Sequence, residues 1–269
     1  MTPHQLPDVL QRGIAIFLFS VGVGLVTTHV LLVALAAQRS SLAQSKKVAA
    51  TAVVGACLIV WLGIAMTLGD RTNFPIVRED LRLPITLVVA FGPVFLGIAA
   101  LFAMKALRAV NAAMPPSWLI WLQIYRIAGF IFLYPYLYYG IVPASFAIPA
   151  ALGDFLTGAL APPVALAVAR RRSHAITWAI AWNLFGILDL TVAPMAAVLS
   201  HASLIGLYPL SLVGLFIGPP MGILAHVYSI RNLRASRSQA AFDGASTLVD
   251  HRGPIENALR TTYPPARLG

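Results

Sequence analysis

Three charged residues lie inside long apolar stretches of this sequence: Arg126, Asp154 and Asp189. Placing a charged side chain in hydrocarbon costs about 2.5–3.5 kcal/mol on insertion scales, so these residues are expected to be paired or hydrated. Two carboxylates that share one arginine can hold one proton between them. The chemistry that these residue types indicate is therefore solute binding or proton relay. Two alternatives stay open: an ion-pair network that only fixes helix packing, or an Arg126 that snorkels to the interface.

Polar or small residues accompany each of the three charges at helical spacing. Trp182, Gly186 and Asp189 recur at i, i+4 and i+7, which places them on one helix face. A glycine in that stripe allows another backbone to approach the acid. No residue is predicted to be catalytic. The predicted intramembrane polar cluster comprises Arg126, Asp154, Asp189, Asn183, Gln123 and Thr157.

The composition determines the class of protein that must position this cluster. The chain has 269 residues, of which 59% are hydrophobic and only 10% charged, whereas soluble domains average about 25% charged residues. Apolar runs of 18 or more residues recur, and each is typical of a transmembrane helix. These runs are continuous rather than alternating, which disfavours a β-barrel. The sequence predicts an all-α, polytopic transmembrane helix bundle.

The predicted bundle occupies residues 14–230 and has about seven spans. A polar lead, 1–13, precedes it, and a polar tail, 231–269, is predicted to be disordered. The first run is longer than a signal-peptide core and lacks a basic leader, so we expect it to be retained, with cleavage as the alternative. The expected spans are 14–37, 48–68, 84–104, 118–142, 146–168, 175–199 and 207–230.

Basic residues in the connections predict the orientation. Alternate connections are rich in Lys and Arg and contain no acid beside the spans, whereas the opposite set mixes both signs. With seven spans, the positive-inside rule places the N-terminus outside and the C-terminus in the cytoplasm, in the inner membrane of a bacterium. The first set consists of Arg39, Lys46, Lys47, Lys105, Arg108, Arg170, Arg171, Arg172, Arg231, Arg234 and Arg237.

This topology also predicts a contact. The fourth and fifth runs are joined by a very short turn around Pro143, so they are expected to be neighbours. At 1.5 Å rise per residue, Arg126 lies about 12 Å from the inner boundary and Asp154 about 12 Å from the outer boundary. In a hydrocarbon core about 30 Å thick, an arginine side chain spans the remaining difference in depth. We therefore expect Arg126 to pair with Asp154, with Asp189 as a second partner or a separately protonated acid.

The sequence favours neither a cofactor nor a nucleic-acid partner. His29 and His226 differ by roughly one turn in depth, which does not favour a haem between them, and Cys57 is the only cysteine. No metal-binding or nucleotide-binding motif is present. The net charge of +10 is explained by basic cytoplasmic loops, because no basic module with interleaved aromatic residues occurs. The expected partners are the lipid bilayer and a small solute or proton, and the oligomeric state stays open.

The C-terminal half contains a pattern of glycines, aromatic and polar residues: Gln123, Tyr125, Arg126, Gly129, Gly140, Pro143, Phe146, Ala147, Gly153, Asp154, Gly158, Trp182, Asn183, Gly186 and Asp189. With these residues, and more loosely with 208–210 and 219–226, this half resembles a group of uncharacterised bacterial multi-pass integral membrane proteins. The resemblance implies the membrane class and brings no substrate or catalytic residue with it.

The function expected from these residues is binding or passage of a small solute through the polar cluster, coupled to a proton. A membrane-embedded enzyme or redox subunit is the second reading. An accessory or sensory protein with a purely structural ion-pair network is the third. A converging, water-accessible cluster favours the first reading, and a fully packed core without a cavity favours the third.

Overall fold

The chain is helical throughout the residues that the computed structural model describes, which are 8–69, 79–140, 142–199 and 212–238. The described part contains no strand, as the apolar runs predicted. In chain order the elements are α1 (Asp8–Arg39), α2 (Gln44–Gly69), α3 (Glu79–Ala103), α4 (Lys105–Ala112), α5 (Pro116–Leu122), the 3₁₀-helix η2 (Gln123–Phe132), α6 (Leu133–Tyr139), α7 (Ala144–Ala169), α8 (Ala175–Leu199) and the π-helix η3 (Val213–Met221). An α-helix at 222–238 continues from η3.

Within the described residues, five helices are long and apolar enough to cross a membrane. They are α1, α2, α7, α8 and the combined helix 116–138 formed by α5, η2 and α6. Helix α3 and the following α4 are bent by 93° and form a sixth candidate if they are counted as one span. The run predicted at 207–230 is described only from residue 212, so its first residues lie outside the described part.

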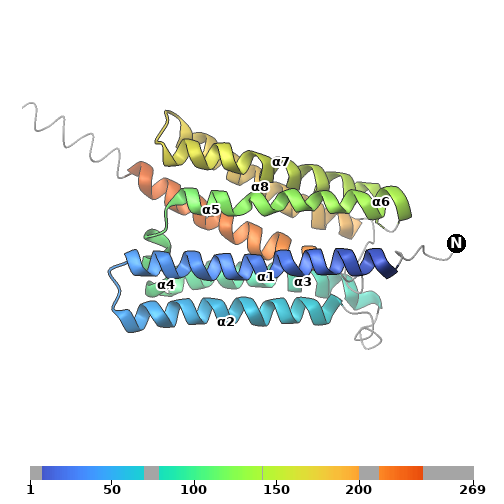
Figure 1. Ribbon diagram of the computed structural model, residues 1–269, viewed down its shortest axis with the longest axis horizontal. Helices are drawn as coiled ribbons and strands as arrows, with labels where there is room; N and C mark the ends of the chain where they lie inside the picture. The colour runs from blue at the N-terminus through green and yellow to red at the C-terminus, as the bar shows by residue number, and fades with distance from the viewer. Residues whose placement is uncertain (1–7, 70–78, 141, 200–211, 239–269) are drawn as a thin grey trace, which may run out of the picture.

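The long helices lie roughly along one common direction, and the C-terminal helix lies inside the bundle (orange in Figure 1). On one side, α7 packs against both η2 and α8. On the other side, α1 packs against α2. Helix η3 contacts α1, α2 and α3 as well as α8, so it joins the two groups. This central position explains why Phe216 of η3 and His226 of the helix that continues from it are fully buried.

The span at 116–138 differs from the continuous α-helix predicted at 118–142, because its middle part, Gln123–Phe132, is a 3₁₀-helix. The buried residues of η2 are Gln123, Arg126, Gly129 and Phe132, each three residues after the last. A 3₁₀-helix has three residues per turn, so these four side chains form one straight row. In an α-helix the same row would rotate by about 60° at every step. The tighter helix is therefore what keeps Gln123, Arg126 and Gly129 all directed at α7.

Short helix α4 was not anticipated by the sequence analysis. The backbone of Met104 is extended (φ −95°, ψ 110°), and this residue separates α3 from α4. The side chain of Asn111 in α4 donates to Oδ1 of Asn232 at 2.8 Å, and Asn232 donates to the carbonyl oxygens of Asn111 and Met114. Both asparagines are buried. This reciprocal pair fastens α4 to the C-terminal helix.

Two predicted domain boundaries differ from the structure. Helix α1 begins at Asp8, inside the predicted polar lead 1–13. The C-terminal helix continues through residue 238, past the boundary predicted at 230, because Asn232 and Leu233 are buried against the bundle. The rest of the predicted tail, 239–269, lies outside the described residues, as does most of the connection at 70–83.

The basic residues that are predicted to face the cytoplasm lie on elements that meet at one end of the bundle. The turn from α1 to α2, helix α4, the turn from α7 to α8 and the end of the C-terminal helix all lie on the left in Figure 1. The start of α1 and the end of α6 lie at the opposite end. We call the left end the basic end; it carries Arg39, Lys46, Lys47, Lys105, Arg108, Arg170, Arg171, Arg172, Arg231, Arg234 and Arg237.

We predict that Gly158→Ala destabilises the bundle by about 1–3 kcal/mol, the usual cost of overpacking. A Cβ atom at Gly158 would lie 2.6 Å from the backbone nitrogen of Ile127, so α7 and η2 would have to separate. Gly63→Ala in α2 is the matched control, because nothing lies within 4 Å of its Cβ position. Unfolding of both variants in mixed detergent micelles measures the difference. Equal stability of the two variants would contradict this packing.

Candidate functional site

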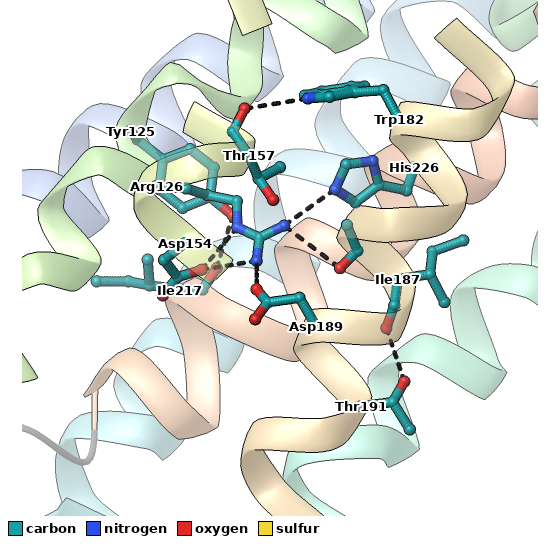
Figure 2. A network of polar contacts seen from close by, with 11 residues as sticks. Tyr125, Arg126, Asp154, Thr157, Trp182, Ile187, Asp189, Thr191, Ile217 and His226 are labelled. Atoms are coloured by element: carbon teal, nitrogen blue, oxygen red, sulfur yellow. Dashed lines mark hydrogen bonds and ion pairs between the residues drawn. The ribbon is translucent and has the colours of Figure 1, made fainter. Parts of the chain in front are cut away.

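The guanidinium of Arg126 lies at the centre of the bundle and contacts both acids (Figure 2). Its Nε donates to Oδ1 of Asp154 at 2.7 Å, and its Nη2 lies 2.7 Å from the same oxygen. The same Nη2 also donates to Oδ2 of Asp189. Arg126 is only 2% exposed. The predicted pairing of Arg126 with Asp154, and with Asp189 as second partner, is confirmed.

The remaining terminal nitrogen of Arg126 faces α8 and the C-terminal helix. Its Nη1 lies 3.2 Å from Nε2 of His226 and 3.4 Å from the carbonyl oxygen of Gly186 (Figure 2). The sequence analysis considered His226 only as a haem ligand and missed this contact. Four elements thus converge on one side chain: η2 provides Arg126, α7 provides Asp154, α8 provides Asp189, and the helix at 222–238 provides His226.

The hydrogen bonds determine the tautomer of His226. The amide nitrogen of Asn183 donates to the carbonyl oxygen of Ala179, so its Oδ1 is the atom that lies 2.9 Å from Nδ1 of His226. An oxygen can only accept, so Nδ1 carries the proton. Nε2 then accepts from Arg126, which can only donate. The contacts at both ring nitrogens therefore indicate a neutral imidazole that is protonated at Nδ1.

Asn183 extends the network toward the basic end. Its Nδ2 also lies 3.2 Å from Oγ of Ser229, one turn after His226 on the same helix. Asn183, His226 and Ser229 are all completely buried. Ser229 was missed by the sequence analysis. Its spacing of three residues from both His226 and Asn232 is the available sequence signal, because that spacing places polar groups on one stripe of an otherwise apolar helix.

Glycines on η2, α7 and α8 make room for the three polar partners of Arg126. A Cβ atom at Gly129 would overlap Asp154, one at Gly153 would overlap Asp189, and one at Gly186 would overlap His226. Each glycine therefore accommodates a side chain that a neighbouring helix directs toward Arg126. The resemblance noted from the sequence included all three glycines, and close helix approach is the reason that glycine suits these positions.

Gln123 and Thr157 are buried beside this network but are not bonded into it. Gln123 is 1% exposed and Thr157 is 0% exposed. In the described part of the chain, the side-chain amide of Gln123 and the hydroxyl of Thr157 have no hydrogen-bond partner. The backbone oxygen of Thr157 accepts from the indole of Trp182 at 3.2 Å (Figure 2). These two side chains therefore keep unused hydrogen-bonding groups beside the network.

A small cavity touches the network on the η3 side. Its walls include Tyr125, Arg126, Asp154 and Ile217. Its volume is about 10 Å³, roughly what one water molecule requires. The hydroxyl of Tyr125 donates to the carbonyl oxygen of Ile217 at 2.9 Å, which ties η2 to the π-helix (Figure 2). In this conformation the cluster admits a water-sized species and nothing larger.

The described residues do not bring three His, Cys, Asp or Glu side chains together at a metal-binding distance. Nδ1 of His29 donates to the carbonyl oxygen of Leu25, and both ring nitrogens of His226 are engaged as above. The absence of a haem or other cofactor stays a prediction. The cluster contains one guanidinium and two carboxyl groups. Its composition suits holding and moving one proton, or balancing one positive charge.

We predict that Arg126→Leu destabilises the protein by about 3–5 kcal/mol, because it leaves the buried Asp154 and the half-buried Asp189 without a counter-ion. Arg234→Leu, which alters an exposed arginine of the C-terminal helix, is the control and is expected to stay within about 0.5 kcal/mol of the wild type. Unfolding in mixed micelles measures both. A change for Arg126→Leu no larger than that of the control would show that the guanidinium does not hold the acids.

The comparisons with known proteins place this site within a family. No curated protein and no solved structure matches the chain. One family model, described as a domain of unknown function (DUF8737), matches residues 83–234. That range is more than half of the chain and includes Arg126, Asp154, Asp189, Asn183 and His226. Helices α1 and α2 lie before it. The chain therefore belongs to the DUF8737 family.

Proposed function

We propose that this chain is a membrane-embedded protein that binds a small polar solute at the Arg126 cluster and passes it across the bilayer in exchange for a proton. The observation that carries this proposal is the charge of the cluster. One buried guanidinium faces two carboxyl groups, so full ionisation leaves one negative charge unmatched within the bundle. A proton on one carboxyl group, or a positively charged solute, balances it.

This imbalance supplies a coupling mechanism. An unmatched charge inside a low-dielectric bundle is costly, so the cluster favours states in which it is neutral. A proton and a positively charged group of the solute then compete for the same negative charge. Neutral His226 accepts from Arg126, and a proton on its Nε2 would break that contact and place two positive groups together. The exchangeable proton therefore belongs to the Asp154–Asp189 pair.

Passage of anything larger than water requires the helices to rearrange. The cavity at the cluster has room for about one water molecule, which corresponds to a closed state in this mechanism. A 3₁₀ segment in the middle of a longer helix often marks a hinge. Helix η2 is such a segment and carries Arg126. The side-chain amide of Gln123 and the hydroxyl of Thr157 lie near Arg126 without hydrogen-bond partners among the described residues, and in this proposal they bond to the solute.

The proposal places the protein in the inner membrane of a bacterium, with seven spans. Its N-terminus then lies outside the membrane and its C-terminus in the cytoplasm. The gathering of the basic residues at one end of the bundle supports this orientation. The α3–α4 pair and the helix that begins with η3 supply the two spans beyond the five candidates.

A purely structural role for the cluster is the second candidate, as part of an accessory or sensory protein. The observation that favours it is the near-complete bonding of Arg126, whose three nitrogens all have partners. A packed ion-pair network of this kind specifies which helices meet. It needs no solute and no movement of protons.

Asp189→Asn separates the two candidates. We expect wild-type protein in proteoliposomes to give transient currents after jumps in pH or in the concentration of small amines and amino acids, and Asp189→Asn to abolish them. Currents on a solid-supported membrane are the measurement. Thr191→Val is the matched control, since Thr191 is exposed and donates to the carbonyl oxygen of Ile187. Wild-type currents no larger than those of empty liposomes would contradict passage and favour the structural role.

The topology gives a separate prediction. A green fluorescent protein fused to the C-terminus should fluoresce in a bacterial host, and alkaline phosphatase at the same position should be inactive, because the basic end faces the cytoplasm. The same reporters fused after residue 75, in the connection between α2 and α3, should give the opposite pair of results. Equal activity at both positions would overturn the orientation.

A further inference from the structure

An open groove lies between α1 and the α5–η2 segment. It has a volume of about 610 Å³, within the range of small-molecule sites. Val21, Gly24 and Leu32 line it on the α1 side, and Trp118, Trp121 and Tyr125 line the other side. Its walls are almost entirely apolar, so the matching ligand is a hydrocarbon chain.

The length of the groove matches one leaflet of a bilayer. From Val21 to Leu32 it follows α1 for about 16 Å at 1.5 Å per residue. Half of a hydrocarbon core is about 15 Å. The groove begins near the basic end, at Leu32 and Trp118, and ends in the middle of the bundle, at Val21 and Tyr125. A single acyl chain of the leaflet at the basic end spans this distance.

The shallow end of the groove carries positive charge. The guanidinium of Arg39 lies 4.3 Å from the centre of the Trp118 ring, which fixes it above the groove. Nζ of Lys47 donates to the carbonyl oxygen of Gln38, the residue before Arg39, and so holds a second cation nearby. The sequence has no acidic residue from 37 to 47 or from 103 to 118. This end therefore complements an anionic group at the membrane surface.

The deep end of the groove reaches the polar cluster. Val21 and Tyr125 also line the small cavity that touches Arg126 and Asp154. The hydroxyl of Tyr125 is bonded to Ile217, so its ring forms the wall between the two spaces. The end of a chain in the groove would lie against that ring.

We propose that the groove between α1 and the α5–η2 segment binds one acyl chain of an anionic phospholipid, with the phosphate held at Arg39 and Lys47. This ligand matches three features of the groove. Its acyl chain matches the apolar walls and the length of one leaflet, and its phosphate matches the cationic shallow end. A zwitterionic lipid offers the same chain but no net charge for the two cations. The proposal does not depend on what the Arg126 cluster transports.

Gly24→Phe tests the chain site, because nothing lies within 4 Å of the Cβ position of Gly24 and a phenyl ring there fills the groove. Gly13→Phe is the matched control on the same helix, equally open and outside the groove. Arg39→Gln tests the headgroup site. Native mass spectrometry of the purified full chain, titrated with phosphatidylglycerol or phosphatidylcholine, measures the affinity of each lipid for the protein.

We expect wild type and Gly13→Phe to bind phosphatidylglycerol more tightly than phosphatidylcholine, and Gly24→Phe to lose the tightest site for both lipids. Arg39→Gln should weaken phosphatidylglycerol alone, by about fivefold for one lost cation. Equal wild-type affinity for the two lipids, or unchanged binding by Gly24→Phe, would overturn the proposal. If Gly24→Phe does not yield folded protein, Arg39→Gln decides, and an unchanged lipid preference then rejects the site.

Discussion

The rest of the structure depends on one buried guanidinium. Arg126 is 2% exposed in an apolar bundle, where a charge without partners would be prohibitively costly. Its three nitrogens contact Asp154, Asp189 and His226, which belong to three other helical segments. Separating any of those segments from η2 would remove a partner from a buried charge. The ion-pair network therefore specifies which helices meet and at what depth, while apolar side chains make up most of the contact area between the helices.

Backbone geometry makes that convergence possible. Gly129, Gly153 and Gly186 each leave the space that a partner of Arg126 occupies. The 3₁₀ winding of η2 keeps Gln123, Arg126 and Gly129 in one row, so the arginine and the glycine that accommodates Asp154 face α7 together. An α-helix would rotate one of them away. The polar cluster and the irregular winding are thus two aspects of one arrangement.

The convergence of Arg126, Asp154 and Asp189 was predictable from the sequence. An unpaired charge in an apolar environment is costly, so the three were expected to pair, and the short turn around Pro143 makes the segments that carry Arg126 and Asp154 neighbours. The sequence did not predict His226 as a partner, since that contact depends on how the C-terminal helix lies between the two groups of helices. Helix α4 was missed because Met104 carries none of the usual breaking signals of glycine or proline. The spacing of three in η2 was visible, but whether such a row winds as 3₁₀ or α depends on its packing partners. Whether the cluster acts on a solute stays a prediction.

The two irregular helices touch each other beside the charges. Helix η3 contains Pro219 and Pro220, which lack the N–H groups that an α-helical ladder needs, and its π winding is the result. Its Ile217 carbonyl accepts from Tyr125 of η2, next to Arg126. Non-α backbone within a membrane is tolerated where protein or a cavity surrounds it, and transporters use such breaks at their binding sites. A change in the Tyr125–Ile217 contact would alter both irregular helices at once. Because the Tyr125 ring also ends the α1 groove, an acyl chain there would contact the residue that links η2 to η3.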